Sequence, residues 1–213
     1  MSKLCNELHI ILNKLPRYSF PLEKDKIFKN GIYVLFEKEE YAHNVDRIVR
    51  IGTHNGDNNL YNRLKEHFIN ENKDRSIFRK NIGRAILNKN NDAYLDIWEI
   101  DFQERKNKEL YGNKLDDNKQ KGIEKKITKY IQKNLSFCLI EIPDRENRLY
   151  FESKLISTIS LCDECKSSKK WLGNYSPKEK IAKSGLWLVN ELYKEPFTKN
   201  ELNKFISKYI SKV

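Results

Sequence analysis

The sequence predicts an α/β fold in which a small antiparallel sheet is flanked by helices, with helical additions at both ends. Two strand-like runs, residues 31–36 (GIYVLF) and 47–52 (RIVRIG), are joined by a charged turn, as expected for a hairpin. A third apolar run, residues 137–143, is typical of a buried strand. Segments with helical spacing precede, separate and follow these runs, and they provide the layers that cover the sheet.

The composition is that of a folded and strongly basic protein. The 213 residues are enough for one full-sized core and too few for two large domains. Aromatic residues make up 11% of the chain, which argues against wholesale disorder. The 41 Lys and Arg against 30 Asp and Glu give a net charge of +11, which favours a polyanionic partner such as nucleic acid. A generally lysine-rich composition is the alternative explanation of the same excess.

We expect no targeting or membrane segment. The N-terminus lacks the long apolar core of a signal peptide, and no apolar run approaches the roughly 20 residues that span a membrane. The four cysteines are therefore expected to be reduced, with the cytoplasm as the expected location.

Residues 4–14 are expected to form a helix that packs on the core. Its apolar side chains fall on one helical face, and Pro16 ends the segment. His9 lies on the polar flank, where we expect it to be solvated.

Alternation along the two hairpin strands predicts which side chains share a face. Tyr33 lies with Leu35 in the first strand, and Arg50 lies with Ile48 and Gly52 in the second. A strand tyrosine is most often a packing residue, so a functional role for Tyr33 needs other support. Two interpretations of Arg50 stay open: a charge near a bound phosphate, or a solvent contact from an edge strand.

A cluster of turn-forming residues at 53–59, which includes His54, leads into a short helix at 60–68 with Asn59 as its N-cap. Arg63 and His67 are four residues apart on this helix and therefore face the same point. Two adjacent cations repel each other, and a phosphate between them would remove the repulsion. The alternative is a pair of solvated polar residues.

A second helix is expected around residues 78–86, where apolar residues recur at helical spacing. The segment is also crowded with cations: Arg75, Arg79, Lys80 and Arg84. These side chains either lie along a phosphate backbone or form an ordinary solvated face, and the sequence favours neither. Residues 94–100 alternate as a strand does, residues 103–126 predict a mobile charged insertion, and a short helix follows near 127–131.

The helix expected at residues 145–161 carries Glu152. Leu155, Ile156 and Ile159 lie three, four and seven residues further on, so this carboxylate shares the buried face. Burying a carboxylate is costly unless a cation compensates it. The candidates are a basic side chain in a salt bridge and a divalent metal ion.

Cys162 and Cys165 have the spacing of a zinc-binding pair. Structural zinc takes four ligands, and the sequence contains no second pair with matching spacing. We therefore do not expect these cysteines to bind metal or to act in redox chemistry. Asn174, in the turn-rich stretch that follows, either caps a turn or braces a nearby site.

The C-terminal region is expected to be helical. Thr198 and Glu201 form a capping box, and an apolar stripe follows it: Leu202, Phe205, Ile206, Tyr209 and Ile210. This stripe packs either on the core or on a second subunit, so a homodimer through the C-terminal helix is one of two alternatives.

Several short elements follow one another in order over roughly residues 30–175. They are residues 31–33 (GIY), residues 50–52 (RIG), Arg63 with His67, Glu152 within residues 151–153 (FES), and Asn174 at the end of residues 171–174 (WLGN). In this order they resemble the motifs of the GIY-YIG nuclease family. Arg50 stands where the family usually has a tyrosine, and this is the main departure.

The resemblance implies metal-dependent hydrolysis of DNA phosphodiester bonds. Glu152 would hold one Mg²⁺ or Mn²⁺ ion, and Tyr33 would orient or deprotonate the attacking water. Arg63 would stabilise the charge that grows on the phosphate, and His67 or His54 would assist proton transfer or hold phosphate. Asn174 would brace the metal site. Restriction, repair, mobile-element and defence roles are all compatible with this activity.

We expect three regions: an N-terminal helical extension (1–28), a GIY-YIG-like domain (29–178) that carries the charged insertion (103–126), and a C-terminal helical extension (179–213). Two other functions fit the same sequence. The altered second motif is consistent with a nucleic-acid-binding module that has lost catalysis. The terminal stripe is consistent with a structural protein that assembles through its C-terminal helix.

Overall fold

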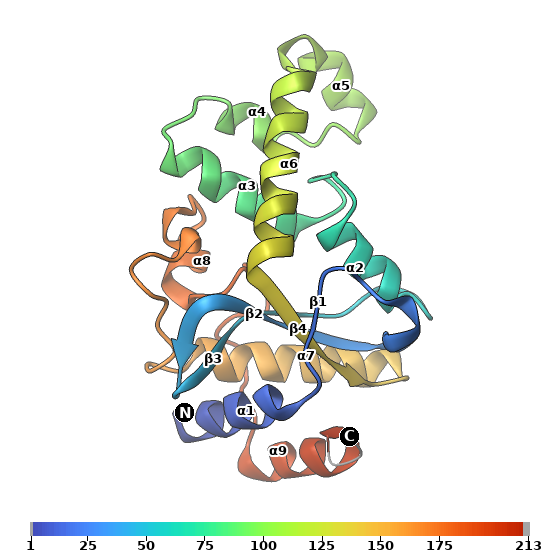
Figure 1. Cartoon of the computed structure of the whole chain (residues 1–213), viewed down its shortest axis with the longest axis vertical. Helices are drawn as coiled ribbons and strands as arrows, with labels where there is room; N and C mark the ends of the chain where they lie inside the picture. Colours follow the sequence, from blue (N-terminus) through green and yellow to red (C-terminus); the bar gives the residue numbers. More distant parts are fainter. Residues whose placement is uncertain (1, 211–213) are drawn as a thin grey trace.

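The computed structural model describes residues 2–210, in which a four-stranded sheet carries helices on both faces (Figure 1). The strands are β1 (Tyr18–Ser19), β2 (Gly31–Ala42), β3 (Val45–Gly52) and β4 (Leu135–Glu141), in the order β1-β4-β2-β3. Every neighbouring pair is antiparallel. The hairpin β2–β3 and the late strand β4 confirm the predicted α/β fold.

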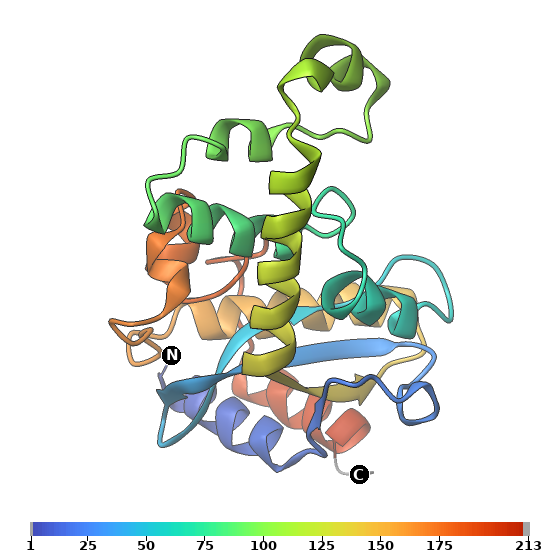
Figure 2. The same ribbon diagram turned by 45° about the horizontal axis from the view of Figure 1, so that its top comes forward.

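Helices lie on opposite sides of the sheet (Figures 1 and 2). Below it in Figure 1 are α1 (Ser2–Lys14), α7 (Arg145–Ser160) and α9 (Lys199–Phe205), which continues into a π-helical turn, Ile206–Ile210. Above it are α2 (Leu60–Phe68), α3 (Ile77–Lys89) and α6 (Asp117–Asn134). The shorter elements are α4 (Leu95–Glu99), α5 (Arg105–Tyr111), α8 (Glu179–Ser184) and the 3-10 turns Lys24–Lys26, Gly112–Lys114 and Leu172–Tyr175.

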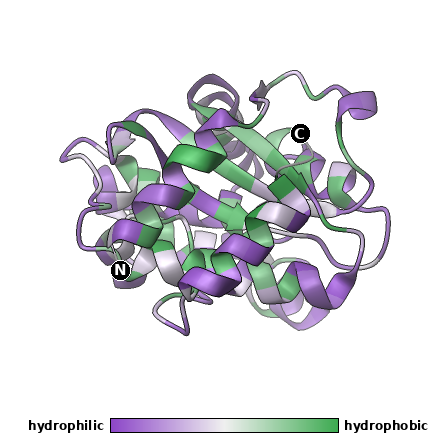
Figure 3. Cartoon of the chain, turned by 90° about the horizontal axis from the view of Figure 1, so that it is seen from below, coloured by the Kyte–Doolittle hydropathy of each residue, from purple (hydrophilic) through white to green (hydrophobic). Residues whose placement is uncertain are grey.

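The sheet separates two hydrophobic cores because successive strand side chains point to opposite faces. Ile32, Val34 and Phe36 of β2 face the lower core with α1, α7 and α9. Tyr33 and Leu35 face the upper core with α2, α3 and α6, as the alternation predicted. Seen from below (Figure 3), the helices carry hydrophobic segments among hydrophilic ones, the pattern of amphipathic helices that cover a core.

A β-bulge in β3 decides which face Arg50 occupies. Two consecutive residues of β2 pair with Arg50 and Ile48, so Val49 is an extra residue in β3. Strict alternation predicted Ile48 and Arg50 on one face, and this prediction is wrong. The bulge leaves Ile48 in the lower core and turns Arg50 toward Tyr33 in the upper one.

The strand predicted at residues 94–100 is also wrong, because this segment contains the short helix α4. Trp98 packs closely over Gly83 of α3, and its indole N–H donates to the carbonyl of Lys80 at 3.0 Å. The Asp92 carboxylate accepts the N–H of Tyr94 at 2.9 Å and starts the turn. Contacts with α3 therefore outweigh the local alternation.

The segment predicted as an insertion, residues 103–126, is helical for most of its length. It contains α5, a 3-10 turn and the first half of α6, whose N-cap Asp116 accepts the N–H of Lys119 at 2.9 Å. Ile123, Ile127 and Ile131 recur every four residues and are buried along α6. Lysines between these positions obscured the period, so the prediction of a loop was wrong.

Helix α1 forms as predicted, but its histidine does not lie in solvent. His9 is fully buried, because the β2–β3 turn and the loop after α7 cover that flank of the helix. The prediction that His9 is solvated is therefore wrong.

The C-terminal helix packs on its own chain. The predicted capping box is present, with the Thr198 N–H donating to the Glu201 carboxylate at 2.7 Å. Leu202 and Phe205 are buried in the lower core, where Phe205 meets Phe151 of α7. Both predicted extensions thus contribute to the core beneath the sheet. Among the described residues, no helix has the length and apolar character to cross a membrane.

Candidate active site

The first motif places Tyr33 where β2 and β3 come closest. Tyr33 pairs with Gly52 across the hairpin, and a Cβ added to Gly52 would lie 2.2 Å from the tyrosine oxygen. A Cβ on Gly31 would lie 2.4 Å from the backbone oxygen of Ile140 in β4. Each glycine is therefore required for a close approach: Gly31 between strands, and Gly52 beneath the tyrosine ring.

Tyr33 is joined to His67 of α2. The hydroxyl of Tyr33 lies 2.8 Å from His67 Nε2, and His67 Nδ1 lies 2.8 Å from the hydroxyl of Ser76. Ser76 is also the N-cap of α3, where its side chain accepts the N–H of Arg79. Both rings of the Tyr33–His67 pair are fully buried. Burial and the nearby charges of Arg63 and Arg50 hold the pKa of His67 well below its ordinary value.

His67 is therefore neutral, and this changes the meaning of its spacing with Arg63. The two residues do face the same point, since Arg63 also interacts with the Tyr33 hydroxyl. The sequence suggested that a phosphate lies between the two residues to relieve the repulsion of two cations. Because His67 carries no charge, the pair does not need such an anion. Burial lowers the pKa of Arg63, but interactions with Tyr33 and Glu66 leave it above its ordinary value. The Glu66 carboxylate accepts from Arg63 Nη1 at 2.9 Å.

Arg50 is the second cation at the tyrosine. Its Nε lies 3.4 Å from the Tyr33 oxygen, its Nη1 donates to the carbonyl of Trp187, and its guanidinium lies over the ring of Phe78. With an exposed fraction of 4%, Arg50 is not a solvent contact of an edge strand. The residue that replaces the second motif tyrosine thus contributes a fixed positive charge to the site.

Glu152 approaches the same end of the hairpin from below, on α7. Its Oε1 accepts the N–H of Thr53, the first residue after β3, at 3.1 Å. Burial raises the pKa of Glu152 to about 7, although Arg50 and Arg63 are near enough to oppose the increase. In residues 2–210 no lysine or arginine forms an ion pair with this carboxylate. The salt-bridge alternative is therefore not what the structure contains.

Two residues near this site were missed in the sequence. Ser76 fixes His67, and its position before an apolar helical period is an N-cap signal that was available. Glu191 is close enough to Glu152 to raise the pKa of that carboxyl group further. No motif marks Glu191, but its backbone φ of 63° is unusual for a glutamate, and such conformations occur at functional sites.

His54 lies beside the site rather than in the Tyr33 cluster. It is buried at the end of β3, where its Nε2 accepts the N–H of Gly31 at 3.4 Å. Burial, followed by the charge of Arg148, lowers the pKa of His54. The side chain therefore closes the open end of the hairpin as a neutral group.

The cations of α3 are mostly engaged inside the protein. Arg79 forms a fully buried pair with Glu124, with Nη2 at 2.6 Å from the carboxylate. Lys80 donates to the carbonyl of Glu99 at 2.8 Å, and Arg84 binds both carboxylate oxygens of Glu99 at 2.6 Å. Of the four predicted DNA contacts, only Arg75 has an exposed side chain, at 62%. The helix does not present the basic face that its sequence indicated, because α4 and α6 supply acidic partners.

Asn174 lies in the 3-10 turn Leu172–Tyr175 and serves its own loop. Its amide donates to the carbonyl of Ser168 at 2.8 Å, and its oxygen accepts from the hydroxyl of Ser167 at 2.9 Å. These bonds are those of a turn-forming residue, the first of the two sequence interpretations. They do not connect Asn174 with Glu152.

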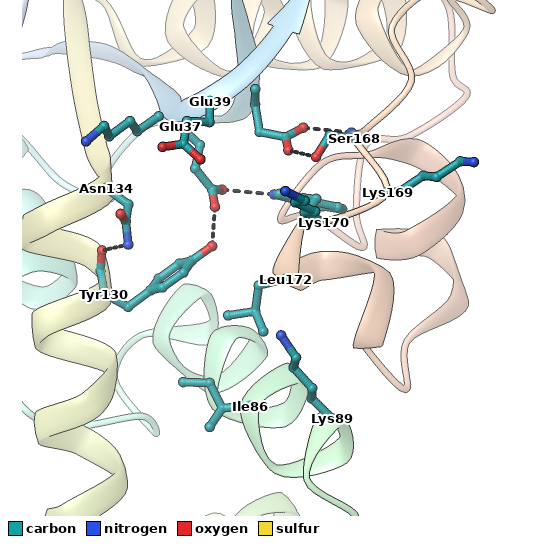
Figure 4. Close-up of a pocket in the computed structure, with 13 residues that line it drawn as sticks. Glu37, Glu39, Ile86, Lys89, Tyr130, Asn134, Ser168, Lys169, Lys170 and Leu172 are labelled. Atoms are coloured by element: carbon teal, nitrogen blue, oxygen red, sulfur yellow. Dashed lines mark hydrogen bonds between the residues drawn. The ribbon is translucent and has the colours of Figure 1, made fainter.

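A cleft of about 730 Å³ opens further along β2, away from these groups (Figure 4). Glu37 lies in its wall, where it accepts hydrogen bonds from the hydroxyl of Tyr130 and from the indoles of Trp171 and Trp187. Burial raises the pKa of Glu37. Since its acceptors are already occupied and no predicted site residue lines the cleft, this cleft is not the site described above.

The antiparallel hairpin with a helix on each side, and with polar groups gathered at its open end, defines a small α/β domain with a candidate active site. A protein-family model described as a GIY-YIG domain matches residues 8–212, and the chain belongs to the GIY-YIG family of nucleases. The match includes most of both terminal extensions, in agreement with their place in the lower core. No curated protein and no solved structure matches the chain.

Proposed function

We propose that the protein is a metal-dependent DNA endonuclease that hydrolyses phosphodiester bonds with the groups around Tyr33. The observation that carries this proposal is the carboxylate of Glu152. It is largely enclosed, has no basic ion-pair partner in the described chain, and binds Thr53 directly after Gly52, the strand partner of Tyr33. A carboxylate in such a place is poorly stabilised by the protein alone, and a divalent cation compensates it.

The residues present fit such an ion. Glu152 supplies a carboxylate oxygen, and Glu191, whose carboxylate is paired with Lys194 at 2.7 Å, is near enough to raise the pKa of Glu152. Carboxylate oxygens are the ligands that Mg²⁺ and Mn²⁺ prefer in proteins. When bound, the ion supplies Lewis-acid stabilisation of charge on the phosphate and on the leaving oxygen. Thr53 fixes the Glu152 carboxylate by donating its N–H to Oε1.

Proton transfer is assigned to Tyr33 and His67. With the proton of His67 on Nδ1, facing Ser76, the lone pair of Nε2 faces the hydroxyl of Tyr33. Tyr33 then orients the attacking water, accepts a proton from it and passes its own proton to His67. The low pKa of His67 keeps the imidazole neutral before the reaction, so the Nε2 lone pair is free to receive the Tyr33 proton. The anionic phosphate of bound DNA would stabilise the imidazolium that forms against the nearby arginines.

Arg50 and Arg63 provide the positive charge that this step requires. In this relay the Tyr33 oxygen carries partial negative charge while its proton moves to His67, and neighbouring cations stabilise that charge. Arg50 lies 3.4 Å from the tyrosine oxygen, and Arg63 interacts with the same oxygen. The same guanidinium groups stabilise the charge that develops on the phosphate. Arg50 therefore takes a role in this chain that differs from that of the family's usual tyrosine.

A catalytically inactive DNA-binding module is the second candidate. Two observations favour it: the second motif lacks its tyrosine, and Tyr33 is fully buried, so DNA reaches its hydroxyl only after the side chains above it move. The family's action on DNA and the net charge of +11 support the partner in both cases.

Cleavage separates the two candidates. Purified protein is incubated with plasmid, linear and branched DNA in Mg²⁺ and then in Mn²⁺, with Glu152→Gln as the control. We expect cleavage by the parent only. DNA binding without cleavage of any substrate in either metal would support the inactive module, and equal cleavage by Glu152→Gln would remove Glu152 from the mechanism.

A further inference from the structure

A second group of metal-binding residue types lies apart from Tyr33 and Glu152. Cys5 and His9 come from α1, His43 from the β2–β3 turn, and Cys165 from the loop after α7. One potential ligand atom of each lies within 4.8 Å of the others. Cys5, His9 and Cys165 are buried, with exposed fractions of 0%, 0% and 4%, and the side chain of the half-buried His43 is 3% exposed.

Three of the separations between these atoms are near those of a tetrahedral site, although the sulfur–sulfur distance is shorter than an ideal edge between two zinc-bound sulfurs. Metal–ligand lengths of about 2.3 Å for sulfur and about 2.0 Å for nitrogen give tetrahedral edges of roughly 3.3–3.8 Å. Cys5 Sγ lies 3.2 Å from Cys165 Sγ, and Cys165 Sγ lies 3.3 Å from His43 Nε2. Cys165 Sγ also lies 3.7 Å from His9 Nε2. The two sulfurs are too far apart for a disulfide, whose bond is about 2.05 Å long.

His43 is oriented as a metal ligand is. Its Nε2 faces Cys165 at 3.3 Å and Cys162 at 3.5 Å, while its Nδ1 lies 3.5 Å from the carboxylate of Glu164. A carboxylate on the far nitrogen is the usual way in which a protein fixes the orientation of a metal-binding histidine. His43 also has a φ of 51°, in a turn where glycine or asparagine is more usual. An imidazole at this position is retained at some cost to the backbone.

His9 has the same kind of support. Its Nδ1 lies 3.0 Å from the carbonyl of Cys5, and a proton shared there leaves the lone pair of Nε2 for the cluster. The N–H of Ile48 lies 3.3 Å from this Nε2, and a metal ion would replace that contact. The sequence spacing Cys5-x₃-His9 places both ligands on one side of α1.

We propose that Cys5, His9, His43 and Cys165 bind one Zn²⁺ ion. Two thiolates and two imidazoles in a tetrahedron are a donor set for Zn²⁺ and not for Mg²⁺. Four protein ligands leave no open position, so the ion is structural. It ties together the N-terminal helix, the tip of the hairpin and the loop after α7, which are far apart in the sequence. This site is independent of the proposed nuclease chemistry.

Metal content tests the proposal without any activity measurement. The full chain is purified under reducing conditions without chelator, and its metals are quantified by mass spectrometry. We expect about one zinc per chain for the parent, and less than about a tenth of that for Cys165→Ser and for His43→Asn. Asparagine tolerates the positive φ of the turn, so the second variant removes the ligand while preserving the backbone.

Two matched controls sharpen the result. Cys138 is a fully buried cysteine outside the cluster, so Cys138→Ser is expected to keep its zinc. Glu152→Gln is also expected to keep it, which separates this site from the proposed catalytic one. Replacement of zinc by Co²⁺ is expected to give the intense visible bands of a tetrahedral thiolate site in the parent, and none in Cys165→Ser.

Three outcomes would overturn the proposal: parent protein without bound metal, iron or copper in place of zinc, or a Cys5–Cys165 disulfide in the unreduced protein.

Discussion

The hydroxyl of Tyr33 lies 2.8 Å from Nε2 of His67, and the two rings meet edge to face with their centroids 5.4 Å apart. This contact joins β2, an inner strand of the sheet, to α2, and its two residues are 34 positions apart in the sequence. Both side chains are fully buried, and His67 is neutral. Because His67 carries no charge, the pair does not bind phosphate by charge, and the proton transfer proposed for it is what the variants below test.

Replacing Tyr33 by phenylalanine tests this assignment. The substitution removes one hydroxyl and keeps the ring over Gly52, so folding and DNA affinity should persist. Cleavage should fall by about 10²–10⁴-fold, the usual contribution of a positioned proton-transfer group. Tyr61→Phe on α2 is the control and should cleave as the parent does. A Tyr33→Phe protein that cuts at the parental rate would remove Tyr33 from the mechanism.

Glu152→Gln should abolish cleavage in Mg²⁺ and Mn²⁺ and should leave the metal-free protein at least as stable as the parent. The variant keeps the shape of the side chain and removes a charge that has no basic ion-pair partner in the described chain. Glu124→Gln is the matched contrast, because Glu124 forms the buried pair with Arg79. Its loss should destabilise the fold by about 3–5 kcal/mol. Thermal melting measures the stability of both variants. It is done without added divalent ions, and also without a chelator, which would remove the proposed zinc ion. A destabilised Glu152→Gln protein that still cuts DNA would contradict the assignment.

The same carboxyl group predicts a pH dependence of stability. Its pKa in the folded protein is about 7, above the ordinary value of 4.5, so folding favours the protonated form. This contribution is complete below the unfolded pKa and is lost as the pH rises through about 7. The stability advantage of Glu152→Gln should therefore be largest near about pH 8 and should shrink toward about pH 5. An advantage that is constant over this range would mean that Glu152 does not titrate there.

Gly52→Ala should abolish the proposed DNA cleavage by displacing the tyrosine. The added Cβ would lie 2.2 Å from the Tyr33 oxygen, so the ring must leave its place beside His67. Gly122→Ala is the control: its Cβ meets nothing within 4 Å on α6, and alanine should stabilise that helix by roughly 0.5–1 kcal/mol. Cleavage and thermal melting of the two variants measure these effects. Full activity of Gly52→Ala would show that the close approach is not needed.

DNA affinity should fall steeply with salt, by about 0.9 log units per phosphate contact for each log unit of salt. Arg75→Gln should reduce this slope, because the Arg75 side chain is exposed. Arg79→Gln should leave the slope unchanged and lower the melting temperature, because Arg79 is paired with Glu124 inside the protein. Binding isotherms measured over a salt series give the salt slope of the DNA affinity for the parent and for both variants. A flat dependence would mean that the net charge of +11 does not serve DNA binding.

The sequence by itself determined the features that depend on neighbouring residues. The hairpin strands, the helix at Leu60–Phe68 and the capping box at Thr198 follow from local period and end signals. The spacing of Arg63 and His67 correctly placed both on one side of α2. The position of Glu152 among apolar residues left a salt bridge and a metal ion as alternatives, and no salt bridge to Glu152 occurs in residues 2–210.

Only the tertiary structure decided which distant groups meet. A basic residue looks the same in sequence whether it faces DNA or a buried acid, and Arg79 became interior because α6 brings Glu124 to it. Arg50 faces Tyr33 because a bulge at Val49, set by strand pairing, reverses the alternation. The sequence showed no second pair of potential ligands with a spacing that matches Cys162 and Cys165. The residues that lie near Cys165, among them Cys5 and His43, come from two other parts of the chain. Periodicity is fixed over a few residues, whereas charge pairing and ligand sets depend on contacts that only the folded chain creates.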